Sequence, residues 1–89
     1  MTTPNPHPEV LKRLKRAHGH LKSVLTMLEE GKACLDIAQQ LHAVTKAIDS
    51  AKRALVHDHI EHCLESAVRD GADNAKETIQ ELTEITKYL

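Results

Sequence analysis

The sequence contains no Phe or Trp and a single Tyr, so nearly all of its large apolar side chains are aliphatic. A chain of 89 residues buries only a modest share of its surface and is marginally stable alone. Without aromatic side chains, the most direct way to gain a sufficient core is to share one with a second copy. We therefore expect the chain to form an oligomer.

Membrane-spanning and secretory segments are also missing. The sequence has no run of about 18 apolar residues, and its start, MTTPNPHPEV, has neither a charged beginning nor an apolar stretch. It has only two cysteines, 29 positions apart, which excludes a disulfide scaffold. These absences predict a cytoplasmic protein with reduced thiols and no membrane partner.

The parts of an enzyme active site are scarce. A cysteine beside a histidine imitates a nucleophile–base pair. However, the sequence has three glycines, no glycine-rich phosphate loop and no evident oxyanion element. A chain this small also has little mass from which to form a substrate pocket. We predict that the protein is not an enzyme.

Charge is distributed unevenly along the chain. Residues 1–56 carry nine Lys and Arg against five Asp and Glu, whereas residues 57–89 carry three against eight. The first part is therefore suited to a polyanion, while the second stays in water or holds cations. The net charge of −1 conceals this division.

A basic stretch, KRLKRAHGHLK at 12–22, has no acidic residue, and none occurs anywhere in 10–28. Oligomerisation would multiply this patch, which predicts DNA binding. No helix-turn-helix spacing is present, so binding would depend on phosphates and DNA shape and would be steeply salt-dependent. The predicted DNA-binding residues are Lys12, Arg13, Lys15, Arg16, Lys22, Lys46, Lys52 and Arg53.

Apolar residues recur in alternating steps of four and three, which is typical of helices that pack along a seam. Prolines make residues 1–8 a flexible arm, and Gly31 ends the first helix. We predict one domain over 9–89, with helices at about 9–30, 34–67 and 74–88. The two long seams are Val10, Leu14, Ala17, Leu21, Val24 and Leu28, then Ile37, Leu41, Val44, Ile48, Ala51 and Leu55.

Three helices, one of them very long, cannot bury all of these stripes in a compact monomer. Two copies of the second helix paired with two copies of the first make a four-helix core. The predicted fold class is therefore all-α, with three helices per chain and an antiparallel four-helix-bundle dimer.

The segment HDHIEHC at 57–63 is a candidate metal site. His59 and Cys63 stand four residues apart and share one helix face. Cys34 lies at the other end of the same predicted helix, roughly 40 Å away by helical rise. In an antiparallel dimer, Cys34 of one chain would face His59 and Cys63 of the other.

These donors restrict the ion. Two thiolates and one imidazole suit Cu(I), Zn(II), Ni(II) or Co(II), and they exclude Mg and Ca. Three ligands are enough for Cu(I), whereas Ni(II) and Co(II) need four to six. His7, on the arm, is the first candidate for an added ligand; the others are His62, Asp58, Glu61, His18 and His20.

The pattern KRLKRAHGHLKSVLTMLEEGKACLDIAQQLHAVTKAI, followed by DHIEHCLE, resembles the CsoR/RcnR family of bacterial metal-sensing repressors over roughly residues 8–68. The resemblance implies a helical dimer that pairs into a flat, disc-shaped homotetramer. It also implies that the metal-free protein holds operator DNA and that an inducer releases it. By position, Cys34, His59 and Cys63 match the core ligands of the family.

The stretches CLDIAQQLHAV and EITKYL, with a His-Pro before the first helix, are closer to the nickel and cobalt sensors called DmeR, in which His7 would be an added ligand. Copper sensors of the family usually have Tyr at the position of Leu35, and the common Gly-Gln is Gly19-His20 here. We therefore expect a repressor of metal efflux that responds to nickel or cobalt. The alternatives are a copper(I)-sensing repressor of the same fold and a metal-binding helical bundle without a DNA role.

Overall fold

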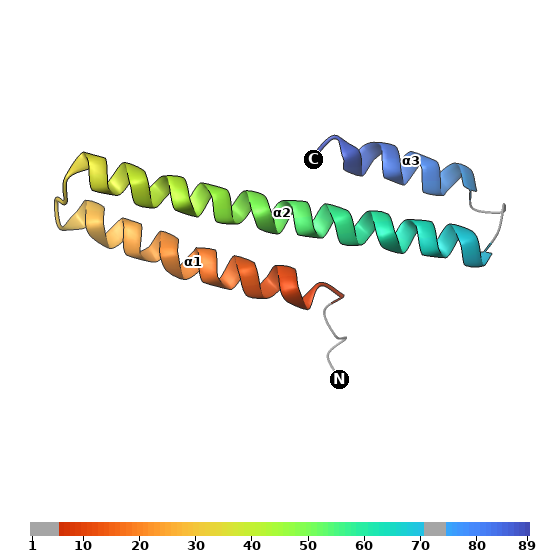
Figure 1. Cartoon of the computed structure of the whole chain (residues 1–89), viewed down its shortest axis with the longest axis horizontal. Coiled ribbons are helices and arrows are strands. Elements are labelled where there is room, and N and C mark those ends of the chain that lie inside the picture. The colour runs from red at the N-terminus through yellow and green to blue at the C-terminus, as the bar shows by residue number, and fades with distance from the viewer. Residues whose placement is uncertain (1–5, 71–74) are drawn as a thin grey trace. The chain divides into compact units, whose positions relative to one another are not determined.

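The computed structural model describes residues 6–70 and 75–89. These residues form three α-helices and no strand: α1 (Pro8–Glu29), α2 (Cys34–Asp70) and α3 (Ala75–Thr86) (Figure 1). The predicted all-α chain with three helices is confirmed. Residues 1–5 of the predicted arm lie outside the described residues, and the single domain over 9–89 stays a prediction. The chain divides into two compact units, Met1–Ala51 and Lys52–Leu89, which are described separately.

The C-terminus of α1 is closed by a glycine cap. Gly31 has a φ of +69°, in the left-handed region that favours glycine. Its N–H donates to the Leu28 carbonyl at 3.2 Å, and the Lys32 N–H donates to the Met27 carbonyl at 3.0 Å. This pair of bonds is the Schellman motif, which satisfies carbonyls that the helix leaves free. The cap fixes where α1 ends and the chain turns towards α2.

Substitution of the two glycines of this unit by alanine should have opposite effects on stability. Gly31→Ala should lower the free energy of unfolding by about 1–2 kcal/mol, because an L-residue at φ of +69° is strained. Gly19→Ala should raise it by up to about 1 kcal/mol, because a Cβ there meets nothing within 4 Å and alanine favours helix. Denaturant unfolding at a fixed protein concentration measures both. A Gly31→Ala variant as stable as the parent chain would contradict the cap.

Helix α2 is continuous over 37 residues. No glycine or proline occurs between Lys32 and Asp70, so nothing in the sequence interrupts its hydrogen bonds. It continues to Asp70, beyond the predicted end near 67, and the next residue in the chain is Gly71. At the other end, Cys34 is the first residue of the helix.

In the unit Met1–Ala51, α1 runs antiparallel beside the first part of α2 (Figure 1). Its core consists of Val24, Ile37 and Val44, with Leu21 and Met27 packed against them. The buried positions recur every seven residues on each helix, which is the spacing of one edge of a seam. They are Val10, Ala17 and Val24 on α1, and Ile37, Val44 and Ala51 on α2.

The other edge of each predicted seam stays in contact with solvent in the single chain. Leu14 and Leu28 of α1 are 42% and 56% exposed, and Leu41 and Ile48 of α2 are both 45% exposed. These aliphatic side chains also lie seven or fourteen positions apart. Within the single chain, they are only partly covered by other residues. About half of the seam is thus left for another surface to cover.

In the unit Lys52–Leu89, α3 runs antiparallel beside the second part of α2 (Figure 1). Val56 and Cys63 of α2 are buried, whereas α3 buries no residue completely. Helix α3 therefore rests on α2 through half-buried side chains, among them Leu82 and Ile85. Among the helices of residues 6–70 and 75–89, none combines the length and hydrophobicity that a membrane span requires.

Candidate metal centre and nucleic-acid interface

Three donor side chains meet where α3 lies against α2. His59 and Cys63 are one helical turn apart on α2, and His59 Nε2 is 3.4 Å from Cys63 Sγ. The Cys63 thiol also donates to Glu81 Oε2 of α3 at 3.5 Å. One ligand atom from each of these residues lies within 4.8 Å of the other two. Cys63 is buried, His59 is half-buried and Glu81 is exposed, so the group opens to solvent on one side.

Burial raises the pKa of the Cys63 thiol above its ordinary value, and the hydrogen bond to Glu81 and the charge of that carboxylate raise it further. Each cause disfavours the thiolate: burial removes water from it, and Glu81 stabilises the proton and repels the negative sulfur. Cys63 is therefore a protonated thiol at neutral pH in this arrangement. A metal ion that takes its sulfur as a ligand must displace the proton.

Substitution of Glu81 should change the acidity of this thiol. In Glu81→Gln the carboxylate charge is lost, so the pKa of Cys63 should fall, although not to its ordinary value because the burial remains. A pH titration of thiolate absorbance in a Cys34→Ala background, which leaves one thiol, measures the change. Glu77→Gln, an exposed residue of the same helix, is the matched control. An unchanged titration in Glu81→Gln would contradict the contact.

The donors fit a transition-metal ion. Imidazole nitrogen and thiolate sulfur are ligands for Zn, Ni, Co or Cu rather than for Mg or Ca, which prefer oxygen. Two such ligands, each about 2.0–2.3 Å from one ion, lie roughly 3.5 Å apart. The separation of 3.4 Å between His59 and Cys63 agrees with this spacing. The pair is therefore arranged to share an ion without a change of helix geometry.

Sequence reasoning missed Glu81. It lies 18 positions after Cys63, on a helix whose acidic residues all look alike in the sequence. Only the packing of α3 against α2 separates it from Glu77 and Glu84. An acidic residue on the apolar side of α3, next to Leu82, was the one available signal.

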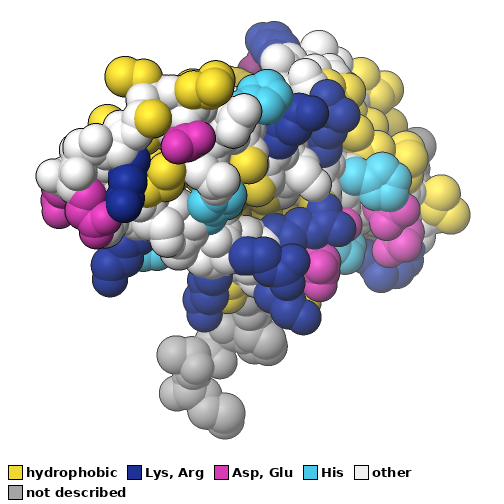
Figure 2. All heavy atoms as spheres, turned by 60° about the vertical axis from the view of Figure 1, so that its left-hand side comes forward, with side chains coloured by type: hydrophobic (Ala, Val, Ile, Leu, Met, Phe, Trp, Pro, Cys, Tyr) yellow, Lys and Arg dark blue, Asp and Glu magenta, His cyan; other side chains and the backbone are white. Residues whose placement is uncertain are grey.

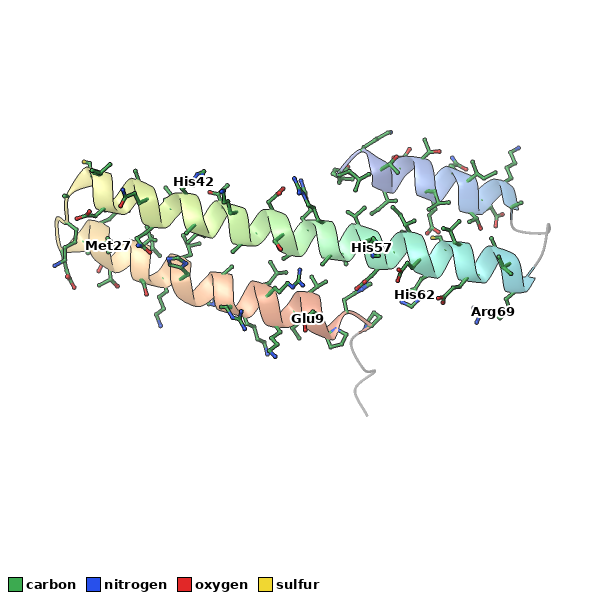
Figure 3. All side chains as sticks on the ribbon, in the orientation of Figure 1. Glu9, Met27, His42, His57, His62 and Arg69 are labelled. Atoms are coloured by element: carbon green, nitrogen blue, oxygen red, sulfur yellow. The ribbon has the colours of Figure 1, made fainter. Side chains whose placement is uncertain are left out.

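A second group of possible ligands lies on the outside of α2. His57 Nδ1 is 3.7 Å from Glu61 Oε1, and Asp58 brings a carboxylate oxygen within 4.8 Å of both. His57 and Glu61 are exposed, so their contact lies in solvent and contributes little to stability. Figure 3 shows His62, another predicted candidate, extending from α2 on the side away from α3.

The other two predicted ligands are not part of either group. Cys34 is exposed at the start of α2, in the unit Met1–Ala51. His7 precedes α1 and is half-buried, and its side chain does not cap the helix. Within the described residues of one chain, His59 and Cys63 are thus brought together without Cys34 or His7. The participation of Cys34 and His7 stays a prediction.

The predicted DNA-binding residues lie mainly on the outside of the helices. Lys and Arg side chains gather over α1 in the lower part of Figure 2. Arg13 is half-buried, pairs with Glu9 at 3.5 Å and donates from Nη1 to Ser50 Oγ at 3.4 Å. The exposed residues are Lys12, Lys15, Arg16, Lys22 and Lys46 in the first unit, and Lys52 and Arg53 in the second.

The chain is thus a small helical protein with a Cys/His donor pair on one unit and a basic helix on the other. The family model described as "Metal-sensitive transcriptional repressor" matches residues 6–88. The chain belongs to this family of metal-sensitive transcriptional repressors. Membership confirms the prediction of a repressor family rather than an enzyme.

Curated relatives include the copper-sensing transcriptional repressor CsoR of Mycobacterium ulcerans, 41% identical over 78 residues. That match covers 88% of this chain and 65% of the relative, so the chain spans less than two thirds of that protein's length. CsoR of Bacillus subtilis is 32% identical over 79 residues, covering 89% of this chain and 76% of the relative. Both relatives are described as copper sensors.

Among solved structures, the nickel-responsive transcriptional regulator InrS is similar, with a TM-score of 0.81 and 29% identity. The match covers 100% of this chain and 99% of that one. The three-helix chain is therefore the fold of this family. Relatives described as copper sensors and a neighbour described as nickel-responsive share it.

Proposed function

We propose that this chain is a cytoplasmic, metal-responsive repressor whose affinity for operator DNA falls when a transition-metal ion binds. The observation that supports this most directly is the His59–Cys63 pair, 3.4 Å apart, in a chain that the repressor family model matches over 6–88. The basic residues of α1 supply the DNA surface. The donor pair and Cys34 supply the sensor, which controls the expression of a metal exporter.

The sensor site is completed between subunits. Two donors on α2 leave an ion under-coordinated, and the exposed thiol of Cys34 is a further soft donor. We place two copies of the chain in an antiparallel four-helix-bundle dimer, so that Cys34 of one subunit meets His59 and Cys63 of the other. Two dimers form a disc-shaped tetramer. The half-exposed edge of the seam, with Leu41 and Ile48, supports an interface of this kind.

Nickel or cobalt is the proposed ion, as in the DmeR-like sensors. A site with two sulfurs and one imidazole, to which His7 or Glu81 is added, offers the four or more donors that these ions need. Bound at this site, the ion supplies positive charge and fixed ligand angles. Copper(I) is the second candidate, because Cys34, His59 and Cys63 alone satisfy three-coordinate copper and the sequence relatives are described as copper sensors.

Cys34 links the sensor to the DNA surface. It lies three positions after Gly31, whose cap joins α1 to α2, so a constraint on this thiol acts on the connection to α1. Helix α1 carries Lys12, Lys15 and Arg16 on its exposed side. A small change at the connection therefore alters how the basic residues of the subunits are spaced. Metal and DNA then oppose each other through a coupling of about 1–3 kcal/mol.

DNA-binding measurements with and without metal test this function. Fluorescence anisotropy of a labelled fragment from upstream of the gene should report binding at moderate salt. NiCl2 or CoCl2 should weaken that binding by about 5- to 150-fold, and anaerobic copper(I) is the comparison. Metal binding without any DNA binding would instead support the helical bundle without a DNA role. DNA binding that no metal ion alters would contradict the sensor.

A further inference from the structure

The outer cluster of α2, formed by His57, Asp58 and Glu61, belongs neither to the His59–Cys63 pair nor to the predicted DNA-binding residues. Its members offer one imidazole and two carboxylates, and one ligand atom from each lies within 4.8 Å of the other two. Sequence reasoning treated Asp58 and Glu61 only as additional ligands for the ion held by Cys63. Their position on the helix argues against that role and indicates a separate site.

The outer cluster faces away from the His59–Cys63 pair. Successive residues of an α-helix are rotated by about 100°, so residues two positions apart lie on nearly opposite sides of it. His57 and Glu61 are each two positions from His59, and Glu61 is also two positions from Cys63. An ion bound between His59 and Cys63 is therefore out of reach of His57 and Glu61.

The distances within the outer cluster fit a shared ion better than a direct hydrogen bond. His57 Nδ1 is 3.7 Å from Glu61 Oε1, which exceeds the usual donor–acceptor distance of roughly 2.7–3.2 Å. Two ligand atoms that are each about 2.0–2.2 Å from one ion lie at most about 4.2 Å apart. The observed separation is within that limit. His57 and Glu61 are exposed, so their side chains can adjust, and the half-buried Asp58 supplies the third ligand atom.

The surrounding part of α2 favours a cation. Residues 54–68 include three acidic residues and no Lys or Arg, and the third acidic residue, Glu65, is one turn beyond Glu61. Arg53, one turn before His57, is the first basic residue on the N-terminal side. Carboxylates attract a divalent ion, and an imidazole nitrogen adds a preference for transition-metal ions over Mg and Ca. The charge and the ligand types therefore select the same kind of ion.

We propose that His57, Asp58 and Glu61 form a second metal site, which binds one Ni(II), Co(II) or Zn(II) ion per chain, with water completing the coordination. Imidazole and carboxylate ligands suit these divalent ions, whereas Cu(I) is selected by sulfur. The proposal does not rest on the repressor function, because neither thiol takes part. Ligands without sulfur, two of them on exposed side chains, hold the ion more weakly than the His59–Cys63 pair, so this site fills second.

Metal binding by a chain without thiols isolates the second site. Equilibrium dialysis of Cys34→Ala/Cys63→Ala against CoCl2 or ZnCl2 should give one bound ion per chain, and amide NMR shifts caused by ZnCl2 should be largest at residues 57–61. Adding His57→Ala should weaken this binding by at least about tenfold, because loss of an outer-shell partner alone costs about 10- to 100-fold. An excess of MgCl2 should not displace the ion, since Mg does not favour imidazole.

His42→Ala is the matched control, because it removes another exposed histidine of α2 and should leave the second site unchanged. Circular dichroism checks that the chain without thiols is folded. In the parent chain, which keeps both thiols, His57→Ala should remove the weaker ion and leave the thiolate charge-transfer bands as they are. This measurement decides the question if the chain without thiols does not fold.

Three results would overturn the second site: no ion bound by the folded chain without thiols, equal binding with and without His57, or displacement of the ion by MgCl2. Loss of the ion in His42→Ala would do the same, because the binding would then not depend on the outer cluster. Failure of metal to release DNA, with the second site still occupied, would instead contradict the repressor function and leave this proposal standing.

Discussion

Cys63→Ala is expected to weaken nickel binding by more than about 100-fold and to abolish the release of DNA by metal. Outer-shell substitutions at metal sites already cost about 10- to 100-fold, and Cys63 contributes a ligand atom directly. Its sulfur is the central donor of the group, 3.4 Å from His59 and 3.5 Å from Glu81. Anaerobic absorption titration, in which thiolate gives charge-transfer bands with Ni(II) or Co(II), measures the loss.

DNA binding by the metal-free variant should be unchanged, because Cys63 lies far along the sequence from the basic stretch at 12–22. His42→Ala is the matched control: His42 is an exposed histidine of the same helix and belongs to neither ligand group (Figure 3). If Cys63→Ala still released DNA at the metal concentration that acts on the parent chain, the donor pair would not be the sensor.

Ile48→Asp is expected to dissociate the oligomer. Ile48 is 45% exposed in the single chain and lies on the uncovered edge of the seam, seven positions from Leu41. An unpaired carboxylate buried in an interface costs about 3–5 kcal/mol, which corresponds to more than a hundredfold in the dissociation constant. Sedimentation of the variant should give a mass near the 9.9 kDa of one chain, against a multiple of it for the parent.

The same substitution should also remove high-affinity metal binding, because Cys34 would lose its partners. Gln39→Asp, an exposed polar position on the same helix, adds the same charge away from the seam and should leave the mass unchanged. A parent chain that sediments as a monomer at micromolar concentration would contradict the shared core. The same result would contradict a metal site shared between subunits.

Periodicity and helix-ending residues made much of the fold predictable. The steps of four and three predicted α1 and α2, and Gly31 predicted the end of α1. These patterns were sufficient because they depend only on local backbone conformation and on one buried helix face. The pattern could not tell which edge of a seam packs within the chain. In the structure Val24, Ile37 and Val44 form the core, whereas Leu41 and Ile48 remain half-exposed.

The candidate site was likewise predictable only where it depends on local helix geometry. His59 and Cys63 are one helical turn apart, so their proximity follows from helix geometry alone. Glu81 reaches Cys63 only because α3 folds back on α2, and no local pattern fixes that register. The proximity of Arg13 to Ser50 likewise depends on how α1 packs against α2, so the basic stretch alone could not predict it. Cys34 depends on a second subunit and remains a prediction.

Mixing of two inactive variants tests the inter-subunit site most directly. Cys34→Ala and Cys63→Ala each lack one ligand in every site, so neither should bind Ni(II) with thiolate charge-transfer bands of parental strength. After subunit exchange, each mixed dimer has one site with Cys34 from one variant and His59 and Cys63 from the other. An inter-subunit site should therefore restore about one quarter of the parental sites in an equal mixture, since half of the dimers are mixed and each has one complete site of two. No recovery after verified exchange, or full binding by Cys34→Ala alone, would contradict it.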